Sequence, residues 1–311
     1  MYPLKLKPAF KDYLWGGTKL KTDYNMKSSL SKLAEAWVLS CHDDGAAIVE
    51  NGEFSGLSLK QAIEKMGDSC LGENGKSFKF FPILIKLIDA HDNLSIQVHP
   101  SDNYALEVEK EYGKTEMWYV VDCDKDAYLY YGFNRDISKD EFTDRIENAT
   151  LLEVLNKVTV HKGDCFFIES GTIHAIGAGL LIAEIQQNSN TTYRVYDYGR
   201  VGVDGKPRQL HVDKAKDVTE LGRPKHPVLH TASGSGDTRL ANCKYFTVDR
   251  FSFDGERIVT VDEKSFSALL LVDGFAKMGD IELNAGDCVF IPASSGEIKL
   301  NGKATILESR V

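Results

Sequence analysis

The sequence predicts a mainly β protein that is built from two β-barrels and carries a small helical insertion. Short runs rich in β-branched and aromatic residues, separated by turn residues, dominate residues 36–197, a pattern typical of an antiparallel sandwich or barrel. Residues 160–168 (VHKGDCFFI) recur as residues 283–291 (LNAGDCVFI), which indicates two copies of one barrel unit. The 311 residues are also long enough for two domains.

The individual elements follow from local patterns along the chain. In chain order, the predicted strands are 36–40, 83–89, 94–98, 117–122, 127–132, 165–168, 180–186 and 192–197. Ser138 with Glu141, and Thr150 with Glu153, have the spacing of a capping box, so we expect the helical insertion at about 138–157. A further helix is expected over 101–112, beginning at Ser101 or Asp102 and ending before Gly113.

Composition excludes several classes of function. The net charge of −9 argues against a nucleic-acid partner, which would require a clustered basic surface. The most apolar segment, residues 80–88, is too short to span a membrane and contains Lys86. The N-terminus lacks an apolar signal segment, and the six cysteines have no CxxC spacing, as expected for reduced thiols of a cytoplasmic protein. We expect a monomer or a homodimer.

Four polar residues predict one metal site. Gln97 and His99 are two apart, so on a strand their side chains point to the same face, which Glu116 and His174 could reach from neighbouring strands. His99 and His174 lie at the ends of predicted strands, where metal sites are commonly assembled. Two imidazoles, a carboxylate and an amide oxygen suit a borderline cation such as Zn²⁺. We therefore expect one zinc ion per chain.

The second copy of the repeat lacks a histidine at the position of His174. When Gly163 is aligned with Gly286, His174 falls on Glu297. A Gly-, Ser- and Pro-rich stretch at 223–237 has the composition of a linker. We therefore expect a catalytic domain over residues 1–230 and a degenerate, metal-free, structural domain over residues 231–311.

Several segments carry a resemblance to a known family. The spacing from Gly163-Asp164 to His174 resembles the second motif of cupins. In their order along the chain, the following segments resemble class I mannose-6-phosphate isomerases of the shorter bacterial type: Trp15-Gly16-Gly17, Ala34-Glu35-Ala36-Trp37, residues 94–100 (LSIQVHP), residues 113–118 (GKTEMW), residues 170–175 (SGTIHA) and residues 193–197 (YRVYD). The resemblance implies a double cupin fold of two jelly-roll barrels, with a reduced helical insertion.

The resemblance also implies the site residues. His99, Glu116 and His174 would bind zinc, with Gln97 as the fourth ligand. Lys86, Glu184 and Arg194 stand where the longer enzymes place an active-site lysine, a carboxylate and an essential arginine. The longer enzymes carry an aspartate near the position of Asn190, so an acid or base role does not transfer to that residue.

The implied reaction interconverts mannose 6-phosphate and fructose 6-phosphate through an enediolate. A metal-bound imidazole is a poor base, so Glu184 or Lys86 is preferred over His174 or a metal-bound water as the proton carrier. Lys86 interrupts an apolar strand, which is unusual unless the lysine is paired or lines a cavity. For Glu184, a second role is about equally favoured, in which its carboxylate only orients a metal ligand.

The remaining cations and aromatic residues have competing interpretations. Arg194, Lys114 and Arg200 are the candidates for binding phosphate, although Lys114 and Arg200 could equally be solvated surface charges. Trp15, Trp37, Trp118 and Tyr196 are expected in the core rather than stacked on sugar.

Two other functions fit part of the pattern. Two histidines and a carboxylate also form the facial triad of an Fe(II) cupin oxygenase. A non-catalytic sugar-binding cupin would use the same residues without a reaction. The Gln97 ligand, together with Lys86 and Arg194, favours the isomerase.

Overall fold

The computed structural model describes residues 1–202, 205–231 and 236–311 and is mainly β, as predicted. The strands are β1 (Leu4–Lys7), β2 (Ala9–Lys11), β3 (Glu35–Leu39), β4 (Ile48–Val49), β5 (Ile83–Ala90), β6 (Ile96–Val98), β7 (Glu116–Cys123), β8 (Tyr128–Phe133), β9 (Leu155–Thr159), β10 (Asp164–Ile168), β11 (His174–Ile176), β12 (Leu180–Gln187), β13 (Tyr193–Tyr196), β14 (Leu229–His230), β15 (Thr238–Asn242), β16 (Thr247–Val261), β17 (Ser267–Met278), β18 (Ile281–Asn284), β19 (Cys288–Ile291) and β20 (Gly296–Arg310). The helices are α1 (Lys19–Thr22), α2 (Leu59–Met66), α3 (Gly72–Gly75), α4 (Asp102–Val108), α5 (Lys139–Glu147) and α6 (Val212–Val218), with 3-10 turns at Gly52–Phe54, Asp68–Leu71 and Leu151–Val154.

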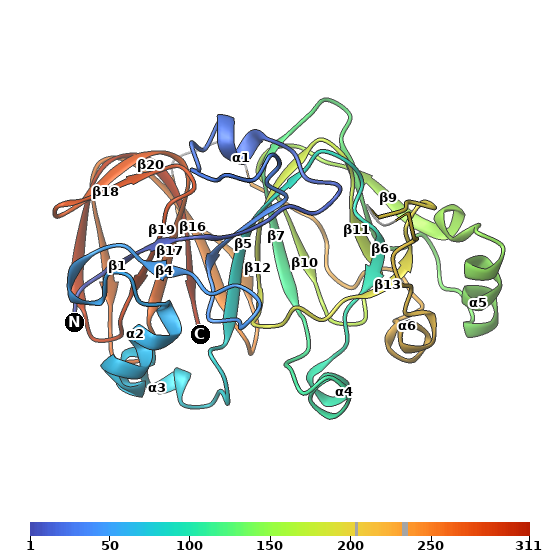
Figure 1. Cartoon of the computed structure of the whole chain (residues 1–311), viewed down its shortest axis with the longest axis horizontal. Coiled ribbons are helices and arrows are strands. Elements are labelled where there is room, and N and C mark those ends of the chain that lie inside the picture. Colours follow the sequence, from blue (N-terminus) through green and yellow to red (C-terminus); the bar gives the residue numbers. More distant parts are fainter. Residues whose placement is uncertain (203–204, 232–235) are drawn as a thin grey trace.

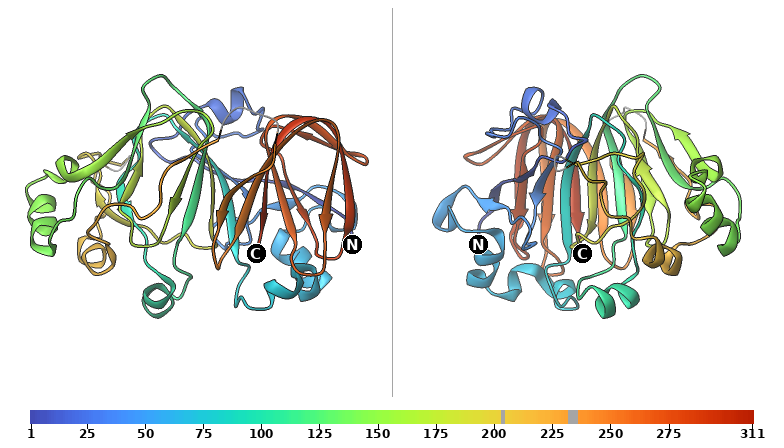
Figure 2. Two further views of the ribbon diagram at one scale, coloured as in Figure 1. Left: turned by 180° about the vertical axis from the view of Figure 1, so that it is seen from behind. Right: turned by 45° about the vertical axis from the view of Figure 1, so that its right-hand side comes forward.

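The strands form three sheets that lie one behind another along the long axis of the molecule (Figure 1). The C-terminal sheet has the order β15-β16-β20-β17-β19-β1-β4, with β18 paired to β17. The central sheet has the order β14-β10-β7-β12-β5-β3-β2, and the outer sheet has the order β13-β6-β11-β8-β9. Helices α2 and α3 lie beside the C-terminal sheet, and α5 and α6 lie at the opposite end, beside the outer sheet (Figure 2).

The central sheet is buried on both faces, which explains why its strands are so apolar. One face packs against the C-terminal sheet through Ile85, Leu181 and other residues of the largest core cluster. The opposite face packs against the outer sheet through Trp118, Ile182 and their neighbours. Along β5, β10 and β12, odd-numbered apolar residues join the first core and even-numbered ones the second, whereas on β3 Ala36, Val38 and Leu39 all join the first.

The internal repeat corresponds to a repeated turn with the same hydrogen bonds. Gly163 and Gly286 adopt φ angles of 92° and 94°, a region that favours glycine. The carboxylate of Asp164 accepts the backbone N–H of His161 at 2.9 Å, and that of Asp287 accepts the N–H of Asn284 at 2.8 Å. Each turn leads into a buried strand, β10 in one copy and β19 in the other.

The N-terminus of the chain belongs to the C-terminal sheet. Strand β1 pairs with β19, in the register Leu4↔Phe290 to Leu6↔Cys288, and β4 pairs with β1. The division at residue 230 stays a prediction, and part of the predicted linker, residues 232–235, lies outside the described residues.

The predicted strands are confirmed to within a few residues, whereas the predicted helices are too long. Helix α4 ends at Val108 rather than before Gly113. The insertion consists of α5 and a 3-10 turn, and strand β9 already begins at Leu155. Ser138 caps α5 by accepting the N–H of Glu141, but Thr150 makes no side-chain cap with any described residue. The side chain of Glu141 binds Arg135 and Arg145, so it does not complete a capping box.

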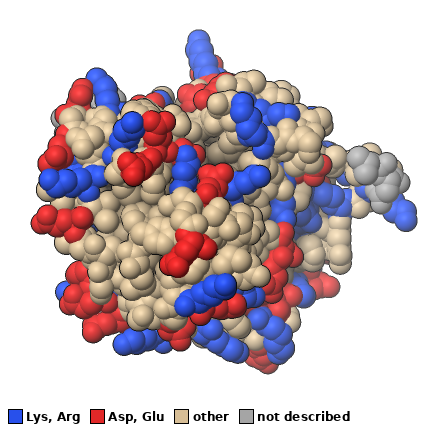
Figure 3. Space-filling view, turned by 60° about the vertical axis from the view of Figure 1, so that its left-hand side comes forward, with Lys and Arg blue, Asp and Glu red and all other residues tan. Residues whose placement is uncertain are grey.

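Two surface features bear on the excluded functions. On the face shown in Figure 3, acidic and basic side chains are interspersed. Within the described ranges, no helix has both the length and the apolar character needed to cross a bilayer.

Candidate metal centre and active site

Strand alternation brings the polar side chains of the central sheet to one face. On β5, Ile85 and Leu87 join the core toward the C-terminal sheet, so Lys86 points the other way, toward the outer sheet. The same alternation on β7 and β12 turns Glu116 and Glu184 toward the outer sheet. The registers place Lys86 opposite Glu184. A row of ionisable groups therefore crosses three adjacent strands.

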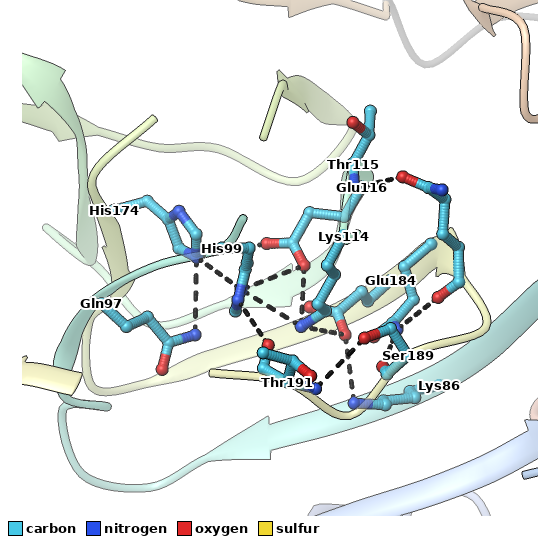
Figure 4. Close-up of polar contacts among 12 residues, drawn as sticks. Lys86, Gln97, His99, Lys114, Thr115, Glu116, His174, Glu184, Ser189 and Thr191 are labelled. Carbon is cyan, nitrogen blue, oxygen red and sulfur yellow. Dashed lines mark hydrogen bonds and ion pairs between the residues drawn. The ribbon is translucent and has the colours of Figure 1, made fainter. Parts of the chain in front are cut away.

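The outer sheet supplies the histidines. His174 begins β11 and pairs with Gln97 of β6, and His99 follows two residues after Gln97. The three side chains His99, Glu116 and His174 are all buried, and their ligand atoms lie within 4.8 Å of one another. This is the one group of its kind found among the described residues, and Figure 4 shows its side chains converging from the two sheets.

Hydrogen bonds fix the tautomer of both histidine side chains. The Nδ1–H of His99 donates to the carbonyl of Thr191 at 2.9 Å, and that of His174 donates to the carbonyl of Thr172 at 2.8 Å. Each Nε2 atom therefore presents a lone pair. Burial, reinforced at His99 by Lys114, lowers the pKa of His99 well below its ordinary value, and burial lowers the pKa of His174 to about 4. Both imidazoles are therefore neutral near pH 7.

The donor set fits a divalent cation. The two Nε2 atoms are 3.1 Å apart, and Glu116 oxygens lie 3.3 Å from His174 Nε2 and 3.6 Å from His99 Nε2. Two ligands that are each about 2.0–2.1 Å from a tetrahedral zinc lie about 3.3 Å from one another. Neither oxygen of Glu116 accepts a well-formed hydrogen bond from a described residue. Facing lone pairs and a buried carboxylate of this kind require a positive charge between them.

Gln97 lies at the edge of this group. Its amide Nε2 is 3.4 Å from His174 Nε2. The nitrogen and oxygen of an amide are assigned from their surroundings, and rotating this amide would present an oxygen at the same place. The position therefore suits the fourth ligand that was expected there.

Lys114 is a buried member of the cluster, not the solvated surface charge of the alternative interpretation. Its side chain is 4% exposed, and its Nζ lies 2.9 Å from Glu116 Oε2, 3.2 Å from His99 Nε2 and 3.7 Å from Glu184. Burial and the nearby Glu184 raise the pKa of Glu116 to about 8. The ammonium of Lys114 thus lies among the same atoms that would bind a metal.

A second charged group adjoins the metal cluster. Lys86 Nζ lies 3.4 Å from Glu184 and 3.6 Å from Glu35, and all three side chains are largely buried. Burial alone would lower the pKa of Lys86, but Glu35 and Glu184 outweigh it and raise the pKa. Burial would raise the pKa of Glu184, but Lys114 and Lys86 lower it to about 2. Lys86 is therefore an ammonium and Glu184 a carboxylate at neutral pH.

The Lys86–Glu184–Glu35 group lines a cavity of about 230 Å³, whereas His99, Glu116 and His174 are not among the lining residues and only their neighbours Gln97 and Lys114 reach the cavity wall. Its walls include Lys86, Gln97, Lys114, Glu184 and Arg194, which the sequence singled out. Arg200 is not among the lining residues: it binds the carbonyl of Asn93 and the carboxylate of Asp197. Asn190 also lines the cavity, and its amide donates to Asp44 at 2.8 Å.

Two residues of the site were missed by sequence reasoning. Arg208 lines the cavity and holds Asp197 through two hydrogen bonds of 2.7 and 2.6 Å. Glu35 lines the cavity and accepts the indole N–H of Trp37 at 2.6 Å. Glu35 is a carboxylate between apolar residues in segment 34–37, and this position could have identified it as a site residue. Arg208 lies in a polar loop and gave no such signal.

The three tryptophans are buried, as expected, whereas Tyr196 is only partly buried against the core of the outer sheet, and each tryptophan also borders the site. Trp37 and Trp118 are fully buried, and Trp118 donates its indole N–H to Glu184 at 2.9 Å. Trp15 is 4% exposed and forms part of the cavity wall.

Comparisons with known proteins agree with this site. Residues 3–129 match the family model described as phosphomannose isomerase type I, catalytic domain, and residues 236–311 match the mannose-6-phosphate isomerase cupin domain. The chain is 38% identical over 319 residues to the mannose-6-phosphate isomerase ManA of Bacillus subtilis, with 99% of each chain covered. It is 35% identical over 316 residues to the mannose-6-phosphate isomerase of Streptococcus mutans, with 99% of this chain and 98% of that one covered.

Solved structures give the same result. The crystal structure of the mannose 6-phosphate isomerase from Bacillus subtilis superposes with a TM-score of 0.89 at 32% identity and covers 100% of both chains. A mutant phosphomannose isomerase from Salmonella typhimurium, at 17% identity, shares the fold with a TM-score of 0.79 over 99% of each chain. The double cupin fold expected from the sequence is confirmed. The chain belongs to the type I phosphomannose isomerases, in their short bacterial form.

Proposed function

We propose that this protein interconverts mannose 6-phosphate and fructose 6-phosphate with the help of one zinc ion, through an enediolate. The observation that carries this proposal is the contact between two buried charged groups beside one cavity. Lys114 links the His99–Glu116–His174 cluster to the Lys86–Glu184 pair, and this pair lines a cavity together with Arg194 and Arg208. The relatives from Bacillus subtilis and Streptococcus mutans match nearly the whole chain and are mannose-6-phosphate isomerases, which supports the choice of substrates.

His99, Glu116 and His174 would hold the zinc, with Gln97 as the fourth ligand. The separations of the donor atoms support this set, as does the buried carboxylate of Glu116, whose oxygens accept no well-formed hydrogen bond from a described residue. When bound, zinc supplies a fixed positive charge beside the sugar oxygens on which negative charge develops during enolisation.

Glu184 and Lys86 are the proposed carriers of the proton between C1 and C2. Moving that proton requires an acceptor near the sugar carbons, and Glu184 is held in its ionised form by two lysines. Lys86 is held in its protonated form by Glu35 and Glu184, so it can donate a hydrogen bond to the developing oxyanion. Trp118 and Lys86 together restrict the Glu184 carboxylate to one orientation.

Arg194 and Arg208 are the proposed phosphate-binding residues. Arg200 and Arg208 both bind the carboxylate of Asp197, and Arg194 lies near this group without a hydrogen bond to it, so the local charge is positive. Burial and Arg208 lower the pKa of Arg194, and its Nε donates to no described residue. An anion in the cavity would satisfy both features. Arg200 contributes its charge from behind Asp197, and Lys114 contributes from the metal side.

The number of zinc ions and the cellular location are also proposals. One ion per chain is expected because Glu297, which replaces His174 in the second copy, is exposed on β20. A cytoplasmic location agrees with six free cysteines. Metal analysis of the purified protein tests the stoichiometry directly.

An assay of turnover tests the proposal. Purified protein is incubated with mannose 6-phosphate, with and without a chelator, and fructose 6-phosphate is measured. We expect conversion that chelation abolishes and Zn²⁺ restores. Absence of conversion in zinc-loaded protein would refute the proposal. Consumption of O₂ with Fe²⁺ in place of zinc would favour the oxygenase, and binding of the sugar without reaction would favour the non-catalytic cupin.

A further inference from the structure

The turn between β12 and β13 holds one of the candidate metal ligands. The carbonyl of Thr191, in this turn, accepts the Nδ1–H of His99 at 2.9 Å (Figure 4). That bond sets the tautomer of the imidazole and the plane of the ring, so it decides where Nε2 points. The turn also separates Glu184 on β12 from Arg194 on β13.

The carboxylate of Glu111 binds three consecutive residues of this turn. Glu111 Oε2 accepts the hydroxyl of Ser189 at 3.3 Å, the backbone N–H of Asn190 at 3.2 Å and the hydroxyl of Thr191 at 3.3 Å. These three donors come from three consecutive residues, the last of which carries the carbonyl that binds His99. The position of this carbonyl is therefore tied to the position of Glu111.

Glu111 is in turn held by His42. The backbone N–H of Asp44 donates to His42 Nδ1 at 3.0 Å, which leaves the proton on Nε2. That Nε2 lies 3.3 Å from Glu111 Oε1, and the His42 side chain is 9% exposed. The His42 interaction and the hydrogen bonds from the turn lower the pKa of Glu111, although burial alone would raise it. The carboxylate is therefore ionised at neutral pH and accepts hydrogen bonds on both oxygens.

Gln186 also holds the turn, through hydrogen bonds to its backbone carbonyls. Its amide, which is fully buried, donates to the carbonyls of Gln187 at 2.7 Å and Ser189 at 2.6 Å. Gln186 thus binds backbone acceptors of the turn, whereas Glu111 binds its donors. Removing Glu111 would take away the acceptor of three donors of the turn and leave it held by Gln186 and by the bond from the Asn190 amide to Asp44.

We propose that Glu111 is a positioning residue for the metal centre, acting through the Ser189–Thr191 turn on the imidazole of His99. The inference rests on the proposed zinc site and goes beyond it, because Glu111 contacts the turn and His42 rather than the metal ligands themselves. Groups that orient a metal ligand in this way change metal affinity by roughly 10- to 100-fold when they are removed.

Zinc affinity, measured by competition with a chromogenic chelator, tests this role. We expect Glu111→Ala to weaken zinc binding about 10- to 100-fold. Glu111→Gln keeps one oxygen for the three donors but turns its NH2 toward the Nε2–H of His42, so its zinc affinity should lie between those of Glu111→Ala and the parent. Glu107→Ala is the matched control, since Glu107 is an exposed glutamate of the preceding helix α4.

Thermal unfolding of the metal-free proteins separates positioning from general stability. A purely structural role would lower the unfolding temperature of metal-free Glu111→Ala and leave its zinc affinity unchanged. If Glu111→Ala folds poorly, Ser189→Ala provides a second test. Ser189 Oγ donates to Glu111 and accepts the N–H of Thr191 at 3.2 Å, so its removal should also weaken zinc binding.

The outcomes are distinct. Unchanged zinc affinity in both Glu111→Ala and Ser189→Ala would overturn the positioning role, as would an equal loss in the Glu107→Ala control. If the parent itself binds no zinc, the proposed metal centre fails rather than the role of Glu111.

Discussion

Replacing Lys114 with methionine should destabilise the metal-free protein much more than the zinc-loaded protein. Lys114 and Lys86 share a buried site with Glu35, Glu116 and Glu184. With the pKa of Glu116 raised to about 8, two ammonium groups face two carboxylates and one largely protonated carboxyl near pH 7. Lys114→Met then leaves one buried negative charge without compensation.

The loss of unfolding free energy can be estimated from the cost of protonating the uncompensated carboxylate. Protonating a carboxylate of ordinary pKa, near 4.3, at pH 7 costs about 3.7 kcal/mol, because each pKa unit is worth about 1.36 kcal/mol. Breaking a buried ion pair typically costs about 3–5 kcal/mol, which agrees. We therefore expect metal-free Lys114→Met to lose about 3–5 kcal/mol of unfolding free energy at pH 7. The loss should shrink as the pH falls toward 5, because protonation of the carboxylate becomes easier.

Zinc should remove most of the difference. Two added positive charges compensate the carboxylates whether or not Lys114 is present, so zinc-loaded Lys114→Met should unfold close to the parent. Urea unfolding of both proteins, with and without zinc, measures the effect, and Lys65→Met on the exposed face of α2 is the control. If Lys114→Met lost the same unfolding free energy in the metal-free and zinc-loaded forms, or lost none in either, the proposed charge balance of the site would be refuted.

Three further predictions concern the site and its support. Arg194→Ala should retain zinc but lose roughly 100- to 1,000-fold in kcat, because it removes a charge that faces the substrate and leaves the ligands in place; full activity in a coupled assay would contradict this role. Zinc binding at pH 6 should release about one proton, because the pKa of Glu116, near 8, lies above that pH whereas that of His174, near 4, lies below it. Affinity should therefore rise with pH up to about 8, and titration calorimetry in buffers of different ionisation enthalpy would reveal the proton, or its absence. Gly177→Ala should cost about 1–3 kcal/mol, because a Cβ there would lie 2.0 Å from the carbonyl oxygen of Tyr128; an unchanged urea midpoint would contradict the close approach.

The parts of the fold that depend on local patterns could be predicted from the sequence. Alternation and turn residues located the strands that carry Lys86, Glu116 and Glu184, and the serine at 138 marked the start of α5. The repeated Gly-Asp turn was visible because both copies need a glycine at positive φ and a carboxylate that caps the turn. Helix ends were less well predicted, since Thr150 had the right spacing but its side chain makes no cap with a described residue.

The parts that depend on distant contacts could not be predicted. Lys114 follows Gly113 in a polar segment, and nothing local distinguishes it from a solvated lysine. Its burial arises from the approach of His99 and Glu184, which lie 15 and 70 residues away in the chain. Arg200 and Arg208 are similar in sequence context, and only the fold places Arg208 in the cavity wall and Arg200 behind Asp197.

The pairing of β1 with β19 has a consequence for biosynthesis. The ribosome makes Leu4 and Leu6 long before their partners Phe290 and Cys288. During most of translation the nascent N-terminal strand has an open hydrogen-bonding edge, which is a template for aggregation in the cell. A truncation that stops translation before residue 288 would leave that edge permanently exposed, although every proposed zinc ligand had already been made. Premature termination near the C-terminus should therefore yield insoluble rather than merely inactive protein.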